Sequence, residues 1–109
     1  MDPISLLLLE KDQFDHVDAV WMNAQVAQTD QEALCNEAAS RDMPAVEKGE
    51  FYIIKREGVF YYNYRVGVDQ LKTQMAVNEA ILVIVSKTAQ PKKAEAMARE
   101  LLNGYIGSK

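Results

Sequence analysis

The stretch FYIIKREGVFYYNYRV, residues 51–66, decides how this sequence folds, because it joins two β-rich runs through a single glycine. Gly58 is the natural left-handed residue of a tight hairpin. A two-residue Glu57-Gly58 loop requires a positive φ at Glu57, which a residue with a Cβ disfavours. A three-residue loop that starts at Arg56 requires this conformation only at the glycine. We therefore predict a hairpin with the three-residue loop.

The predicted register sorts the side chains of the hairpin between the two faces of the sheet. It pairs Ile54 with Phe60 and Ile53 with Tyr61. One face is apolar or aromatic throughout and carries Tyr52, Ile54, Phe60, Tyr62 and Tyr64. The other face is mixed and carries Phe51, Ile53, Lys55, Val59, Tyr61, Asn63 and Arg65. We predict that the first face is core, and the second is left for a functional explanation.

The N-terminal half predicts a strand followed by helices. Residues 4–9 form an apolar run of strand length. Asp12 is a suitable N-cap, and apolar residues follow at three- and four-residue steps from Phe14 to Trp21. A capping-box pattern at residues 29–32 predicts a second helical segment through Leu34, Cys35 and Ala38. Asp42, Met43 and Pro44 should end the helical region, because the residue before proline is disfavoured in a helix.

The C-terminal half predicts a helix, a strand and a final helix. Residues 68–78 indicate a short helix, with Leu71 and Met75 turned inward. No glycine or proline separates it from residues 80–85, which favours one long helix over 69–87. Four of those six residues are β-branched, which favours a central strand, and we prefer the strand for 80–86. The final helix should begin at Pro91 and end just before Gly104.

This element order predicts a two-layer, ferredoxin-like β-α-β-β-α-β fold with an extra C-terminal helix. The alternative packs helices on a small, hairpin-centred sheet, with 69–87 as one long helix. The length of 109 residues indicates a single small α+β domain over 1–109. A composition that is 49% hydrophobic and 26% charged is typical of a soluble globular protein.

The bulk features indicate a cytoplasmic protein. The longest apolar run is too short to span a bilayer, and the N-terminus lacks the features of a secretory signal. Cys35 is the single cysteine, so an internal disulfide is impossible, which fits a reducing compartment. The formal charge is −8 over residues 1–50 and +4 over residues 51–109. This asymmetry favours two surfaces that attract within one fold, although head-to-tail association is the alternative.

The sequence offers little for catalysis. Cys35 lies among apolar residues of a predicted helix, and His16, the single histidine, has Asp12 one turn away. Both residue types have ordinary structural explanations in these settings. No ligand spacing indicates a metal site, and no glycine-rich motif indicates a nucleotide. We assign no catalytic residue, metal or cofactor, and we favour a non-enzymatic protein while leaving an enzyme open.

A nucleic-acid partner is disfavoured as well. The stretch after Glu57 keeps the glycine of the RNA-recognition strand motif and aromatics at Tyr61 and Tyr64. It places Glu57 where the motif has a basic residue and Phe60 where it has a small one. The net charge of −4 weakens affinity for phosphates further.

The start of the last helix is a candidate anion-binding site. Its residues are Lys87, Thr88, Lys92 and Lys93. Positive charge in the first helical turn opposes the helix dipole, and a bound phosphate or carboxylate would relieve this. Solvation of the lysines explains the pattern equally well, and Pro91 removes one amide from such a site. We favour solvation.

The leading functional hypothesis is an interaction or regulatory module that self-associates as a homodimer and contacts other proteins. Its predicted interface or ligand residues lie on the mixed hairpin face and are Phe51, Ile53, Lys55, Val59, Tyr61 and Arg65. Large apolar side chains left in water on a small monomer usually mark an interaction site. The alternative is a dimeric α+β-barrel-like protein or enzyme that binds a small molecule between sheet and helices, where His16 or Tyr61 would be the polar group.

Overall fold

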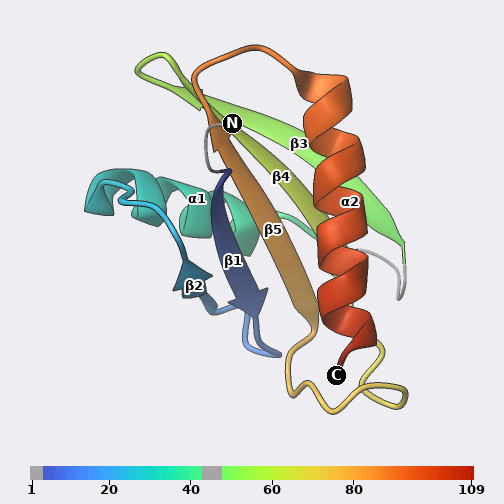
Figure 1. The fold of residues 1–109 in the computed structure, drawn as a ribbon. Helices are drawn as coiled ribbons and strands as arrows, with labels where there is room; N and C mark the ends of the chain where they lie inside the picture. The colour runs from blue at the N-terminus through green and yellow to red at the C-terminus, as the bar shows by residue number, and fades with distance from the viewer. Residues whose placement is uncertain (1–3, 43–47) are drawn as a thin grey trace.

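The computed structural model describes residues 4–42 and 48–109 of the chain. Two helices and five strands follow one another as β1 (Ser5–Lys11), β2 (Val17–Met22), α1 (Gln28–Ser40), β3 (Gly49–Arg56), β4 (Val59–Gly67), β5 (Glu79–Ser86) and α2 (Pro91–Gly107). The strands form one antiparallel sheet in the order β2-β1-β5-β4-β3. Figure 1 shows α2 running along the front of this sheet and α1 crossing behind it.

The predicted ferredoxin-like fold is wrong. The sheet has five strands rather than four, and a helix covers each face, so the molecule has three layers instead of two. The alternative with one long helix over 69–87 is wrong as well, because this range contains the strand β5 and a non-helical connection before it. Of the broader expectations, the α+β composition and the β-hairpin are confirmed. Neither helix of the described chain is long and apolar enough to cross a membrane.

The first error lies in the segment after Asp12. The Asp12 carboxylate accepts hydrogen bonds from the amides of Phe14 and His16, at 2.8 and 3.0 Å. With Asp15 at a φ of +63°, the chain turns back and β2 pairs with β1. Aspartate therefore builds a turn here instead of capping a helix, which are two uses of the same side-chain chemistry.

The second error lies between β4 and β5. Residues 68–78 form a non-helical connection, in which Leu71 is 98% exposed while Met75 is buried as predicted. The Asp69 carboxylate accepts from the Leu71 amide at 2.9 Å, and the Asn78 amide donates to the Lys11 carbonyl at 2.9 Å. A local bond at Asp69 and a bond from Asn78 to the end of β1 therefore hold this connection in place of helical bonds.

The other elements agree with the sequence in type, although α1 begins at Gln28 after the N-cap Ala27, without the capping box predicted at residues 29–32. The strand preferred for 80–86 is confirmed, because β5 is the central strand and is paired on both sides. The helix expected through Leu34 and Ala38 is α1, whereas the predicted stop at Met43 and Pro44 lies outside the described residues. The last helix begins at Pro91 as expected but continues through Gly104 to Gly107.

The hairpin of β3 and β4 uses the two-residue loop, so the predicted register is off by one. Arg56 pairs with Val59 and Ile53 pairs with Tyr62. Glu57 and Gly58 take φ values of +49° and +80°, as in a type I′ turn. The twist of a primed turn suits the two long strands, and the benefit of that pairing outweighs the strain at Glu57.

The slip redistributes the hairpin side chains between two cores. Phe60, Tyr62 and Tyr64 face α2, where they join Leu82, Ile84 and the buried Ala98 and Leu102 of α2. On the opposite face, Tyr61 joins a second core built on Leu34 and Ala38 of α1. Tyr52 and Ile54 also lie on the α1 face, so the single apolar face predicted for the hairpin does not exist. A one-residue shift always exchanges the two faces of a strand.

Substitution at Glu57 tests the turn. Glu57→Asn should raise the free energy of unfolding by about 0.5–1 kcal/mol, because asparagine tolerates the left-handed region that other side chains avoid. Gly58→Ala should lower it by about 1 kcal/mol or more. Urea unfolding followed by circular dichroism measures both. Glu57→Gln, which keeps the same backbone strain, should change little. Equal stabilities of the Asn and Gln variants would contradict the two-residue turn.

Candidate functional site

An exposed apolar surface beside α2 forms a groove between this helix and the β1–β2 edge of the sheet. α2 packs on β4 and β5, so the same face of β1 and β2 lacks a helical cover. Three large apolar side chains that line it are exposed: Ile4, 41%, Val20, 49%, and Trp21, 50%. Leu101, 41% exposed, falls between the lining residues Met97 and Tyr105 at four-residue steps of α2, which puts it on the same side of the helix. We call this surface the α2–β2 groove. It is lined by Ile4, Leu8, Glu10, Val20, Trp21, Lys93, Met97 and Tyr105, over Leu82 and Ile84.

The lower half of the groove, near the C-terminal end of α2, is apolar. It contains a hollow of about 470 Å³ lined by Leu8, Glu10, Val20, Trp21, Leu82 and Tyr105. Trp21 lies opposite Leu8 in the β1–β2 pairing, and an irregularity between Leu8 and Leu9 turns Val20 to the same side. A bulge in an edge strand re-aims side chains in this way. Glu10 supplies the charge at this end.

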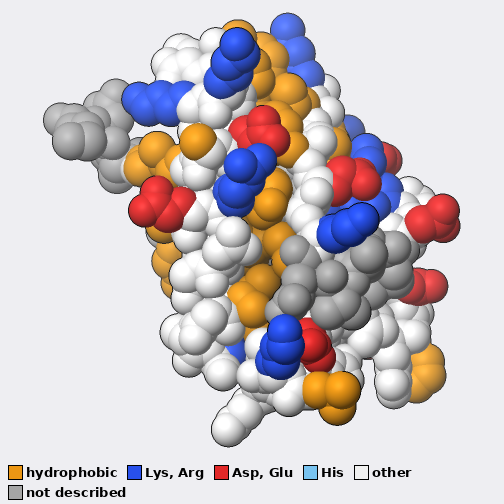
Figure 2. Space-filling model, turned by 90° about the vertical axis from the view of Figure 1, so that its right-hand side faces the viewer, with side chains coloured by type: hydrophobic (Ala, Val, Ile, Leu, Met, Phe, Trp, Pro, Cys, Tyr) orange, Lys and Arg blue, Asp and Glu red, His pale blue; other side chains and the backbone are white. Residues whose placement is uncertain are grey.

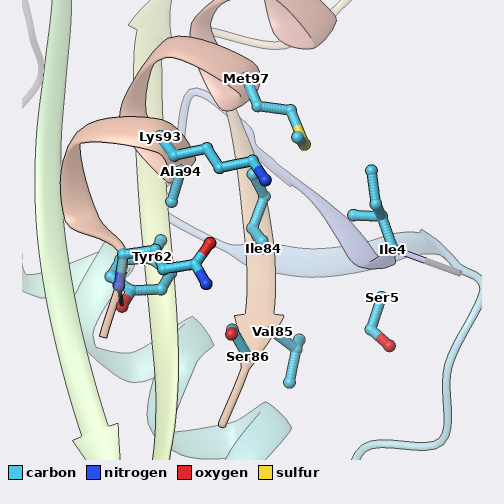
Figure 3. Close-up of a pocket in the computed structure, with 10 residues that line it drawn as sticks. Ile4, Ser5, Tyr62, Ile84, Val85, Ser86, Lys93, Ala94 and Met97 are labelled. Carbon is cyan, nitrogen blue, oxygen red and sulfur yellow. Dashed lines mark hydrogen bonds between the residues drawn. The ribbon is translucent and has the colours of Figure 1, made fainter. Parts of the chain in front are cut away.

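The upper half of the groove, near the N-terminal end of α2, is more polar. Its hollow of about 310 Å³ lies between α2 and the ends of β1 and β5. Figure 3 shows the Lys93 side chain reaching across from α2 toward Ile84, with Ile4 and Met97 beyond it. The Tyr62 hydroxyl at its wall donates to the Thr88 carbonyl at 2.9 Å and accepts from the Gln90 amide at 2.8 Å. This hydroxyl therefore fixes the position of the loop between β5 and α2.

The predicted anion-binding residues are only partly gathered here. Lys93 lines the upper hollow, and Thr88 lies at its edge, where its hydroxyl contacts Ser86 at 3.0 Å. Lys87 and Lys92 are exposed and do not line the hollow. The anion site stays a prediction, with Lys93 as its best-placed residue.

The predicted hairpin interface is divided by the sheet. The corrected register puts Phe51, Ile53 and Lys55 on the α2 face and Val59, Tyr61 and Arg65 on the α1 face. Figure 2 looks onto the side of α2 and β3 and shows a band of hydrophobic side chains between charged ones. Ile53 is 46% exposed on this side, and Phe51 is half-buried. The structure thus brings together two apolar members of the set rather than all six residues.

Tyr61 and Arg56 hold the first turn of α1. The Tyr61 hydroxyl donates to Asp30 at 2.7 Å, and the Arg56 Nε donates to the other carboxylate oxygen at 2.7 Å. Burial and this bond to Asp30 raise the pKa of Tyr61 to about 12. The bonds from Arg56 and Tyr61 lower the pKa of Asp30. A phenol held in this way acts as a structural tie between the hairpin and α1.

Arg65 belongs to a row of alternating charges across four neighbouring strands on the α1 face. Lys11 Nζ lies 4.0 Å from Glu79 Oε2, and Arg65 lies 3.3 Å from Glu79 Oε1 and 3.1 Å from Glu50. Lys11 also donates to the carbonyls of Ala38 and Arg41, at 3.1 and 2.8 Å, and so closes the C-terminal end of α1. We call Lys11, Glu79, Arg65 and Glu50 the charge row. Three of its four members are buried.

The charge row is incompletely satisfied. Arg65 Nε and Glu79 Oε2 have no hydrogen-bond partner among the described residues, and neither do the nearby Tyr52 hydroxyl and Asn63 Oδ1. Burial raises the pKa of Glu79, although Arg65 and Lys11 act in the opposite direction. The hydrogen bond from Arg65 lowers the pKa of the exposed Glu50.

The residues considered for catalysis lie apart. His16 is exposed in the β1–β2 turn, 3.6 Å from Asp12. Cys35 is half-buried on α1, and burial raises the pKa of its thiol, which weakens it as a nucleophile. The described residues contain no cluster of three or more metal-ligating side chains. None of the protein-family models scanned matches this sequence, and no curated protein matches it.

The sequence interpretation missed the groove because it placed Val17–Met22 in a helix. A signal was present: Val17, Ala19 and Met22 face the α1 core, whereas Val20 and Trp21 face the groove. The bulge breaks the simple alternation that would have indicated a strand. An unbroken helical stripe and an interrupted strand are equally compatible with these six residues.

The charge row generates a pH prediction. A carboxyl whose folded pKa is raised stabilises the fold most below its unfolded pKa, about 4.5 here, and loses this contribution as the pH rises through the folded pKa. The unfolding free energy of the wild type minus that of Glu79→Gln should therefore fall as the pH rises above 4.5. Urea unfolding at a series of pH values measures this difference.

Glu50→Gln is the matched control, because it makes the same chemical change in the same row. The Glu50 pKa is lowered, so its contribution is present above about 4.5 and is lost as the pH falls. Its difference curve should thus slope the opposite way, with a small amplitude because Glu50 is exposed. A Glu79 curve that rises with pH would mean that the ion pairs outweigh burial.

Proposed function

We propose that this chain is a small, non-enzymatic interaction module that acts through protein–protein contacts and self-association, with the α2–β2 groove as its contact surface. The observation that carries the proposal is the half-exposed Trp21 beside Val20 on an edge strand. Tryptophan is the residue most strongly enriched among those that dominate binding energy. Here it stands at the wall of an apolar hollow instead of in the core.

The edge position of β2 supports the same proposal. An edge strand presents unpaired backbone groups, and natural proteins usually protect it with charges, prolines or a cover. β2 carries one charged residue, Asp18, among Val17, Ala19, Val20, Trp21 and Met22. The bulge in the β1–β2 pairing makes the backbone of β2 irregular, which hinders non-specific pairing with a strand of another protein. A contact through the side chains of β2 is then favoured over a contact through its backbone.

The Phe51–Ile53 patch on the other side of α2 is a smaller candidate surface. It has one strongly exposed apolar side chain, Ile53, whereas three line the groove. Lys55 lies over the Phe60 ring, with its ammonium 5.1 Å from the ring centre, and so covers part of this patch with a charged group. The groove is therefore the better contact surface.

The alternative function, binding of a small molecule between sheet and helix, has less support. The upper hollow does lie between the sheet and α2. Its buried hydroxyl, on Tyr62, is already engaged by two backbone groups. The polar groups considered for a substrate lie elsewhere, because His16 is in the β1–β2 turn and Tyr61 is bonded to Asp30.

Self-association should be visible in Trp21, the single tryptophan of the chain. As the concentration rises from low to high micromolar, its emission should shift to shorter wavelength while the mass from light scattering increases. Trp21→Ser should raise the dissociation constant by at least about tenfold, because an interface tryptophan typically contributes about 2 kcal/mol. Leu101→Ser should act in the same direction.

Two control variants localise the surface. Leu71→Ser removes an equally large apolar side chain that is 98% exposed outside the groove, and it should leave association unchanged. Ile53→Ser probes the patch on the other side of α2, and it should also have little effect. A wild-type protein that stays monomeric at high micromolar concentration would overturn the self-association that we propose.

A further inference from the structure

The two ends of the α2–β2 groove carry opposite charges that lack ion-pair partners among residues 4–42 and 48–109. Lys93 lies at the upper end and Glu10 at the lower end. Neither residue forms an ion pair with any other residue that the structure describes. The groove between them is apolar, so the surface as a whole has a basic end, an apolar middle and an acidic end.

Each end is electrostatically unfavourable in the isolated chain. At the basic end, Lys92 and Lys93 occupy the first turn of α2, where positive charge opposes the helix dipole, and this turn contains no acidic residue. At the acidic end, Glu10 pairs directly with Asp18 across β1 and β2. Like charges placed opposite each other on neighbouring strands repel. Both ends therefore gain from a partner of opposite charge.

We propose that the partner in the groove is a second copy of this chain, packed antiparallel across a two-fold axis. This inference rests on the proposed function and identifies the partner and its orientation. In this arrangement the Lys93 end of one groove meets the Glu10 end of the other, twice by symmetry. A parallel pair of grooves would instead place lysine on lysine and glutamate on glutamate.

The spacing of the groove residues suits such a pairing. Lys93, Met97, Leu101 and Tyr105 follow each other at four-residue steps, so they lie along one line of α2. This line is about 18 Å long at the helical rise of 1.5 Å per residue. A two-fold axis at its middle places the apolar Met97 and Leu101 near the centre and the charges at the rim, which is the usual anatomy of an interface.

A second copy fits better than an unrelated protein for one reason. The groove already contains both members of the complementary pair, at positions that a two-fold axis exchanges. Such an isologous contact closes at two copies and leaves neither charged end uncovered. It also buries the exposed Trp21 of both chains in one step.

Charge exchange tests the orientation. Lys93→Glu and Glu10→Lys should each raise the dissociation constant of the dimer by about tenfold or more, since each creates two like-charge contacts. The double variant should restore association to near the wild-type level. Lys92→Glu makes the same charge change one residue away from the groove line and should have a smaller effect. Sedimentation equilibrium measures all four variants, and circular dichroism checks that they fold.

Cysteine cross-linking provides a second readout that does not depend on affinity. In a Cys35→Ser background, Lys93→Cys protein mixed with Glu10→Cys protein should form an intermolecular disulfide under mild oxidation. Lys93→Cys alone should not, because the antiparallel arrangement separates the two copies of this residue. A disulfide in the Lys93→Cys protein alone, without one in the mixture, would indicate the parallel arrangement and overturn the inference.

The outcomes separate this inference from the proposed function. If Trp21→Ser weakens the dimer but the double variant does not restore the association lost in Lys93→Glu and Glu10→Lys, the contact surface is supported and the antiparallel pairing is refuted. A wild-type monomer at high micromolar concentration refutes the second copy as the occupant. Rescue by the double variant together with the mixed disulfide would confirm both the surface and the orientation.

Discussion

The structure depends on the row of alternating charges that crosses four strands beneath the end of α1. Lys11, Glu79 and Arg65 are buried, and a buried charge is tolerated only when oppositely charged or hydrogen-bonding groups surround it. Lys11 finds them in the last carbonyls of α1, and Arg65 finds the Asp42 carbonyl at 2.7 Å. A one-residue slip of either strand would move its cation into the apolar core under α2, so the row specifies both the register and the position of α1.

The position of the helices in turn creates the groove. α1 packs over β1 and β2 on one face, whereas α2 packs over β4 and β5 on the other. Since α2 packs over β4 and β5, the α2 face of β1 and β2 is left without a layer. The unlayered half is where Val20 and Trp21 stand exposed. The contact surface that we propose is thus a consequence of α2 covering only part of its face of the sheet.

Features that depend on local chemistry were predictable from the sequence, and those that depend on competition between distant segments were not. Pro91 marks the start of α2, and the β-branched run identified β5, since both signals act within a few residues. Asp12 could cap a helix or build a turn, and the pairing of β2 with β1 decided for the turn. At Glu57 the local conformational preference pointed to the wrong loop, because pairing along two strands outweighs strain at one residue.

The candidate site divides in the same way. The sequence by itself determined that a glycine turn would divide the hairpin and that lysines would occupy the first turn of the last helix. Only the tertiary structure decided which apolar residues remain outside. It buried Tyr61 against Asp30 and Arg65 in the charge row, and it left Trp21 in water, because exposure is set by which segment covers which face of the sheet.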